Sequence, residues 1–256
     1  MGEIQVRAVN GGEVKGSLEA GCFFSLPALG DGRYMLAQID DYMHLPRSGF
    51  PHQPPIRIYL EAQVSAADLP GTWGFGLWND PFSFGFGAGG MSRVLPELPN
   101  AAWFFYGSSG NFLSLRDDQP ASGFHAKTFS SPLIPSLFSL GAIPELPLLL
   151  WKGGRKWARR VSRWFVQEEA APIDICVNDW HAYELLWERD RVTFFVDGDI
   201  HLKTSISPRG KLGLVIWIDN QFFRFTLEGE IGFGFQPTGR SHWMVVREFS
   251  MIHGWG

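Results

Sequence analysis

The stretch that decides the fold begins at Trp180, ends at Gly198 and reads WHAYELLWERDRVTFFVDG. Two of its runs, 182–187 and 192–196, are rich in aromatic and branched apolar residues and are separated by charged residues, which is the pattern of neighbouring β-strands. Asp197-Gly198 is a dipeptide typical of a tight hairpin turn, and a third strand follows over 200–203. This part of the chain is therefore predicted to be an antiparallel meander.

Strand signals recur along the rest of the chain, separated by Gly, Pro and charged residues. The composition agrees, because 30 Gly, 17 Pro and an aromatic share of 15% suit short strands and tight turns better than long helices. Many short strands joined by turns indicate an all-β sandwich or jelly roll. The further strand candidates are 57–64, 73–78, 101–106, 211–218, 222–227 and 243–252.

The chain of 256 residues is expected to form one domain over 1–256, because a single β-sandwich often reaches this length. Hydrophobic residues make up 45% and charged residues 19%, which provides a core and excludes a mostly disordered chain. Cys22 and Cys176 allow at most one disulfide, and no Cys/His spacing resembles a zinc site. We therefore expect no metal and no cofactor.

Two features of the sequence bear on the location of the protein. The N-terminal stretch MGEIQVRAVNGGEVKG contains no basic segment followed by an apolar run, so a secretory signal peptide is not predicted and a cytoplasmic location is expected. The most apolar stretch, 130–151, contains four Pro residues and Glu145, which would interrupt a membrane-spanning helix several times. A transmembrane segment is therefore not expected.

The region 129–172 interrupts the strand pattern and is predicted to be an insertion. Its first half is rich in Pro and Leu, and its second half, 151–168, contains six Lys or Arg residues before the first acidic residue. The net charge of the whole chain is −4, so the positive charge of this segment stands out. Most of the basic residues of this segment lie between its apolar ones. Helical periodicity places four apolar side chains on one face, those of Trp157, Val161, Trp164 and Phe165.

Two interpretations of this basic amphipathic helix remain open. In the first, the helix packs its Trp-bearing face on the sandwich and its arginines stay in solvent. In the second, the segment 151–168 lies on an anionic membrane or closes a cleft as a lid. A nucleic-acid partner is not expected, because the rest of the chain is acidic and would repel it.

Three separated motifs resemble those of the family-16 glycoside hydrolases and their concanavalin A-like lectin/glucanase relatives. The stretch 180–198 is similar to the W-H-x-Y-x-x-x-W…F-Y-V-D-G motif of the family, and LEAQV at 60–64 with PGTWGFGLW at 70–78 is similar to E-A-R-(I/V)-K…G-x-W-P-A-F-W. The run 243–252 resembles the closing strand. The resemblance implies a jelly-roll sandwich of two antiparallel sheets with a carbohydrate-binding groove on one face.

The sequence departs from this family at the catalytic strand. Hydrolytic members carry E-x-D-x-x-E there, whereas the matching place in this chain is PNAAWFFYG at 99–107, which has no carboxylate. A retaining glycosidase needs two carboxyl groups roughly 5–5.5 Å apart, so hydrolysis of this type is not expected. In some members the closing strand also supplies an Asp to a structural calcium, but Arg247 stands near that position.

Two residues are candidates for acid–base catalysis. His125 lies where the family has a cleft strand, and a histidine beside aromatic side chains can exchange a proton near neutral pH; a structural hydrogen bond is the other interpretation. Asp80 lies at the mouth of the cleft, where it either serves as a carboxylate or forms a turn between Asn79 and Pro81. For Glu61 we expect a structural role.

Aromatic side chains are the candidate ligand-binding residues. In the strand 101–106, Trp103 and Phe105 are predicted to face the groove, because alternate residues of a strand share a face; a shift of one residue would place Ala102 and Phe104 there instead. The Gly-rich stretch 85–90 is predicted to be a loop at the groove rim. The platforms for sugar stacking or apolar contact are Trp73, Trp78, Trp103, Phe105, Tyr106 and Trp217.

Two functions are compatible with these observations. The first is a glycan-binding, lectin-like protein whose aromatic groove lacks the hydrolytic pair. The second is an intracellular carrier or an isomerase-like or cyclase-like acid–base enzyme that acts on an apolar small molecule beneath the insertion 129–172. An open groove with polar side chains would favour the sugar, and a closed apolar cavity would favour the small molecule.

Overall fold

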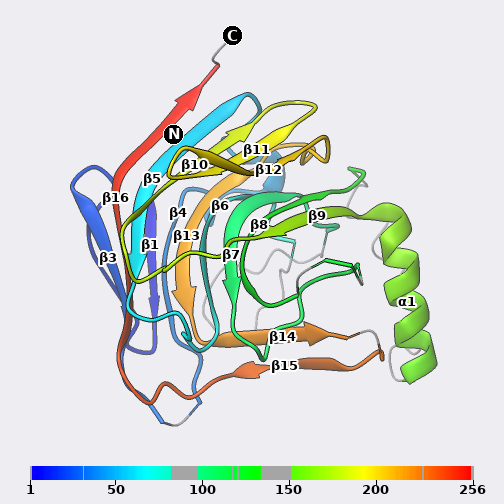
Figure 1. The fold of residues 1–256 in the computed structure, drawn as a ribbon, viewed down its shortest axis with the longest axis horizontal. Helices are drawn as coiled ribbons and strands as arrows, with labels where there is room; N and C mark the ends of the chain where they lie inside the picture. Colours follow the sequence, from blue (N-terminus) through cyan, green and yellow to red (C-terminus); the bar gives the residue numbers. More distant parts are fainter. Residues whose placement is uncertain are drawn as a thin grey trace.

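The computed structural model describes residues 2–30, 32–81, 97–116, 118–119, 121–133, 151–226 and 228–254. Two large antiparallel sheets lie face to face, and the helix α1 (Lys152–Phe165) lies beside them (Figure 1). A short 3-10 helix covers Arg47–Gly49. The all-β jelly-roll sandwich predicted from the sequence, with an inserted basic helical segment, is confirmed.

Sheet A contains seven antiparallel strands in the order β1-β4-β13-β6-β7-β8-β9. In that order their bounds are Gln5–Val9, Leu36–Asp40, Gly213–Asp219, Thr72–Trp78, Ala101–Gly107, Gly123–Ser130 and Gln167–Pro172.

Sheet B contains seven antiparallel strands in the order β12-β11-β10-β5-β16-β3-β2. In that order their bounds are Asp199–Thr204, Val192–Val196, His181–Trp187, Ile56–Val64, His242–His253, Gly21–Leu26 and Glu13–Ser17. A separate hairpin, β14 (Gln221–Phe225) with β15 (Ile231–Phe235), runs from the sandwich toward α1 (Figure 1).

The meander predicted from 180–198 is confirmed as β10, β11 and β12. Asp197 and Gly198 form its turn with φ values of 52° and 89°, the left-handed conformation that a two-residue hairpin turn requires. The Asp197 carboxylate accepts a hydrogen bond from the Ala182 backbone N–H at 2.8 Å, and its second oxygen lies 2.6 Å from His181 Nδ1. These local contacts fix the register of the meander.

The main core lies between the two sheets and follows from the period of two along each strand. In β7, Ala102, Phe104 and Tyr106 belong to this core, whereas Ala101, Trp103 and Phe105 belong to a second apolar cluster on the other face of sheet A. Trp103 and Phe105 therefore share the face of sheet A that points away from sheet B, as strand alternation predicted, and are not part of the core between the sheets. Every residue of β7 is buried, so both faces of sheet A are covered at this strand.

Of the two interpretations of α1, the first, in which its Trp-bearing face packs on the sandwich, is wrong. Trp157 and Trp164 are 51% and 79% exposed, and the side chain that is buried from this helix is Arg159, which is 3% exposed. The reason is that carbonyl oxygens face α1 from the body of the protein and require donors: the Arg159 guanidinium donates to Ser114 O at 2.6 Å and to Phe225 O at 2.9 Å. The ends of the predicted insertion 129–172 belong to strands β8 and β9.

Within the described residues, no helix has both the length and the apolar character that a membrane span requires. The predicted Gly-rich rim loop at 85–90 and the Pro/Leu-rich part of the insertion at 134–150 lie outside the described residues.

Candidate binding site on the outer face of sheet A

The face of sheet A that points away from sheet B carries an aromatic cluster, defined here as Trp78, Trp103, Phe105, Phe129 and Trp217. Trp103 is at its centre, because its ring centroid lies 5.6 Å from that of Trp78, 5.4 Å from Phe105 and 5.6 Å from Trp217. The Trp103 side chain is 8% exposed. The cluster is thus a continuous apolar surface that other parts of the chain cover.

Glycines of β6 make room for these rings. Gly74 pairs with Phe105 on one side and with Trp217 on the other, and Gly76 pairs with Trp103. A Cβ atom at Gly74 would lie 2.9 Å from Trp217 Cη2, and one at Gly76 would lie 2.7 Å from Trp103 Cβ. The alternating glycines of TWGFGLW therefore let neighbouring strands pack large rings across β6.

A buried ion pair borders the aromatic cluster. Lys127 of β8 pairs in register with Trp103, and its Nζ lies 2.8 Å from Glu168 Oε1 of β9 and 5.0 Å from the centroid of the Phe129 ring. Lys127 Nζ also donates to Leu113 O at 2.8 Å. Burial lowers the pKa of Lys127, and the negative charge of Glu168 opposes that shift.

The Glu168 carboxylate is held from a second direction. It accepts hydrogen bonds from Ser114 Oγ at 2.7 Å and from the Leu115 backbone N–H at 2.8 Å. These bonds, with the one from Lys127 to Leu113 O, hold residues 113–115, which follow β7 in the chain, against β8 and β9. Every oxygen of this carboxylate is engaged, so its geometry is that of an anchor.

His125 lies beside this pair on the same face of β8. It pairs in register with Phe105, and it is buried. Burial, and next the positive charge of Lys127, lower the pKa of His125 to about 4, so the imidazole is neutral at pH 7. A neutral imidazole has one nitrogen that donates and one that accepts, which suits it to bind a hydroxyl group or to exchange a proton with one.

Three polar atoms on this face are buried and have no hydrogen-bond partner among the described residues: Trp78 Nε1, Trp103 Nε1 and His125 Nδ1. Trp217 differs, because its Nε1 donates to Thr72 Oγ1 at 2.9 Å. Leaving a buried polar group unpaired costs roughly 1–3 kcal/mol. The outer face of sheet A therefore offers two donors and one imidazole nitrogen to a ligand among aromatic rings.

A buried carboxyl group that the sequence analysis missed lies at the end of β13. Asp219 Oδ1 accepts hydrogen bonds from Thr72 Oγ1 at 2.8 Å and from the backbone N–H groups of Thr72 and Gln221, both at 3.1 Å. Burial raises the pKa of Asp219 to about 7. The only signal in the sequence is that an Asp directly follows the apolar run LVIWI.

Two of the predicted platforms do not belong to this site, and this corrects the prediction. Trp73 and Tyr106 lie in the core between the sheets, where their ring centroids are 5.6 Å apart. The Tyr106 hydroxyl donates to Leu69 O at 3.2 Å. The reason is that side chains alternate between the two faces of a strand. Because Trp103 and Phe105 lie on the outer face of β7, Tyr106 lies on the inner face; in β6, Trp73 and Trp78 are an odd number of residues apart and so also lie on opposite faces.

The described structure places Glu61 on β5 of sheet B, away from the aromatic cluster, and Asp80 two residues after the end of β6. Asp80 has a φ of 46°, the left-handed conformation common in turns, and its carbonyl oxygen accepts a hydrogen bond from Arg47 Nη2 at 2.7 Å. Glu61 accepts a hydrogen bond from Arg247 Nε at 2.7 Å across β5 and β16. Among the described residues, no group of three His, Cys, Asp or Glu side chains is arranged to hold a metal ion.

Comparisons with known proteins give fold similarities only. Neither the models of protein families nor the curated protein sequences match this chain. Solved structures do, and they include GH16 proteins, the family that the stretch 180–198 resembles.

Three of these structures illustrate the range. The κ-carrageenase of Pseudoalteromonas carrageenovora, in complex with an oligotetrasaccharide of κ-carrageenan, is similar at 8% identity with a TM-score of 0.49 over 97% of this chain and 89% of that one. A GH16 protein of the Bacteroides ovatus mixed-linkage glucan PUL, in complex with a product, is similar at 11% identity with a TM-score of 0.46, over 94% of this chain and 85% of that one. A putative β-glucanase of Mycobacterium abscessus is similar at 10% identity with a TM-score of 0.46, over 91% of this chain and 76% of that one.

Proposed function

We propose that the protein binds a carbohydrate on the outer face of sheet A, at the aromatic cluster, and does not hydrolyse it by the two-carboxylate mechanism. The observation that carries this proposal is the set of unpaired buried polar atoms, Trp78 Nε1, Trp103 Nε1 and His125 Nδ1, beside aromatic rings. A ligand for this face needs both apolar surface and hydrogen-bonding groups.

Carbohydrate has this combination of properties. The C–H face of a sugar ring packs on an indole or phenyl ring, and its hydroxyl oxygens accept hydrogen bonds from indole N–H groups. A hydroxyl can also donate to the unpaired nitrogen of the neutral His125. A purely apolar ligand would leave all three atoms unpaired, at roughly 1–3 kcal/mol each. The donor pattern therefore favours a sugar over a hydrocarbon.

The burial of the cluster limits how such a ligand binds. Trp103 and Phe105 are 8% and 5% exposed, so a sugar reaches their rings only if side chains packed on the cluster move aside. A covered site of this kind favours a short oligosaccharide or a chain end over the middle of a long polymer.

The absence of carboxylates from β7 supports the non-hydrolytic part of the proposal. Ala101–Gly107 has no Asp or Glu, and Glu168 is engaged by Lys127, Ser114 and Leu115. Neither a nucleophile nor an acid partner at the required separation of about 5–5.5 Å is available on this strand.

Calorimetry with a panel of gluco-oligosaccharides tests the proposal. Trp78→Phe and Trp103→Phe keep a ring but remove the N–H, so each is expected to weaken binding about 5- to 10-fold. The matched control is Trp243→Phe, because Trp243 packs on Phe23 of sheet B and should leave affinity unchanged. Failure of the unchanged protein to bind any oligosaccharide, or an equal loss in all three variants, would overturn the proposal.

A second candidate function, acid–base catalysis on a small molecule, is favoured by one observation. The neutral His125 lies in a covered apolar site with an unpaired nitrogen and with Lys127 next to it on the strand. Its pKa of about 4 makes it a weak base at pH 7, so it would need a substrate proton that is already acidic. If the protein turns over a small molecule, His125→Gln should abolish turnover while binding persists.

A further inference from the structure

The helix α1 presents aromatic side chains to solvent. Trp157 and Trp164 are 51% and 79% exposed and lie seven residues apart, which places them on the same face of the helix. Exposed indole rings of this size are uncommon on a soluble surface unless another surface covers them.

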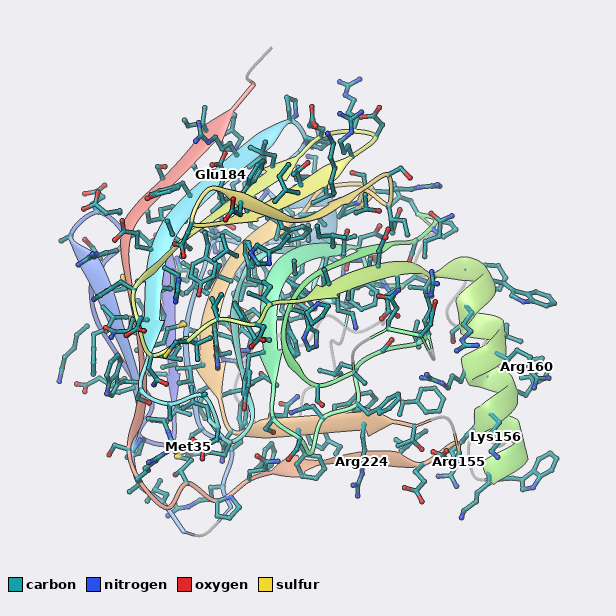
Figure 2. The ribbon with its side chains drawn as sticks, viewed as in Figure 1. Met35, Arg155, Lys156, Arg160, Glu184 and Arg224 are labelled. Carbon is teal, nitrogen blue, oxygen red and sulfur yellow. The ribbon has the colours of Figure 1, made fainter. Side chains whose placement is uncertain are left out.

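Basic side chains lie on this same face. Lys156 and Arg160 are exposed. Arg160 lies three residues after Trp157 and four before Trp164, and Lys156 lies four residues before Arg160; Figure 2 shows Arg160 pointing away from both sheets. Lys152 is exposed at the N-terminal end of the helix. The whole helix Lys152–Phe165 contains no acidic residue. The exposed face of α1, defined here by Lys156, Trp157, Arg160 and Trp164, is both aromatic and cationic.

The body of the protein fixes this orientation of the helix. Arg159 donates to Ser114 O and Phe225 O, and its guanidinium carbon lies 5.3 Å from the centroid of the Phe112 ring. Arg163 Nε donates to Leu115 O at 2.6 Å. Rotating α1 to bury its tryptophans would break these bonds, so the aromatic and cationic face stays directed outward.

We propose that the exposed face of α1 is a docking surface for an anionic lipid membrane. Indole rings favour the headgroup level of a bilayer, and Lys and Arg beside them bind lipid phosphates and the negative surface potential. Charge complementarity selects this occupant, because the helix has six basic residues and no acidic one while the chain as a whole has a net charge of −4; Glu228, in the turn between β14 and β15, is an acidic neighbour of Lys156. Attraction to anionic lipid is therefore expected to be strongest at this helix, which would orient the protein on the membrane.

Sedimentation of the full chain with vesicles tests this proposal. Binding is expected with vesicles of phosphatidylcholine and phosphatidylserine at low salt, with a strong decrease as salt is added. Each basic side chain near such a surface contributes on the order of 1 kcal/mol, so Lys156→Gln/Arg160→Gln should weaken binding about 30-fold. Trp157→Ser/Trp164→Ser should also weaken it, at all salt concentrations.

Matched variants separate this face from general surface effects. Lys203→Gln/Lys211→Gln removes two other exposed cations, and Val6→Ser/Ile200→Ser removes two other exposed apolar side chains. Both should bind vesicles as the unchanged protein does. No binding to anionic vesicles at low salt, equal loss in the control variants, or a dimer in solution that only Trp157→Ser/Trp164→Ser dissociates would each overturn the proposal.

Discussion

Lys127 Nζ lies 2.8 Å from Glu168 Oε1, and the two side chains are 2% and 0% exposed. This pair joins β8 to the edge strand β9, which follows α1 in the chain. It also borders the aromatic cluster, since Lys127 is in register with Trp103. One buried contact therefore links the position of the inserted segment to the shape of the candidate site.

Removing one partner of this pair should destabilise the protein strongly. In Lys127→Met the buried Glu168 carboxylate loses its countercharge, and breaking a buried pair in this way costs roughly 3–5 kcal/mol. Urea unfolding at pH 7 measures the change. The control is Arg240→Met, which removes an ion pair with Asp68 that is largely in solvent and should cost less than about 1 kcal/mol.

A smaller loss in the double variant Lys127→Met/Glu168→Gln than in Lys127→Met is also expected, because the Gln has no charge, its amide oxygen can accept from the Leu115 N–H, and its amide nitrogen can donate to Ser114 Oγ. If Lys127→Met cost no more than the surface control, the pair would contribute nothing to holding β9.

His125 should make stability depend on pH in the acidic range. Its pKa in the folded protein is about 4, below the ordinary value of 6.5, so the unfolded chain binds the proton more readily. The contribution of His125 to the free energy of unfolding is therefore complete above pH 6.5. It is lost as pH falls from 6.5 toward 4, by about 3 kcal/mol in total.

Unfolding free energies of the unchanged protein and of His125→Gln, measured between pH 4 and 7, test this expectation. The variant should lose less stability on acidification. The exposed His44→Gln is the control and should follow the unchanged protein. Parallel curves for all three proteins would show that His125 is not buried as a neutral group.

Gly76 should tolerate no side chain. A Cβ atom there would lie 2.4 Å from Ala102 O and 2.6 Å from Trp103 Cα, and both are backbone atoms that cannot turn aside. Gly76→Ala is therefore expected to cost more than about 2 kcal/mol and to disturb the aromatic cluster. Gly30→Ala is the control, because no atom lies within 4 Å of its added Cβ. Equal melting temperatures for the two variants would contradict the tight packing of β6 on β7.

The sequence predicted those parts of the fold that depend on local signals. The meander β10–β12 follows from alternation and from the Asp197-Gly198 turn, whose requirement for left-handed backbone is met within two residues. The N-terminal strands were not predicted. β2, with the sequence EVKGS, has four exposed residues of five, so its strand form depends on pairing with β3 and not on its own hydrophobic pattern.

The orientation of α1 could not be predicted, because periodicity shows that a helix has two faces but not which one packs. The partners of Arg159 are carbonyl oxygens 45 and 66 residues away in the chain. The same holds for the candidate site: strand parity correctly placed Trp103 and Phe105 together, but the unpaired atoms and the pair Lys127–Glu168 depend on how four strands meet.

Asp219 should limit stability at neutral and alkaline pH. Its folded pKa of about 7 lies above the ordinary value of 3.8, so its contribution is complete below pH 3.8 and is lost as pH rises toward 7. In Asp219→Asn the amide oxygen can still accept from Thr72 and Gln221, but no charge is buried. This variant should be about 2–4 kcal/mol more stable than the unchanged protein above pH 7 and equal to it near pH 4.

Asp219→Ala should be less stable at both pH values, because the Thr72 and Gln221 donors lose their acceptor. Thermal unfolding at the two pH values distinguishes these outcomes: if Asp219→Asn is as unstable as Asp219→Ala at high pH, the charged carboxylate itself holds its donors, and the pKa of Asp219 is not raised.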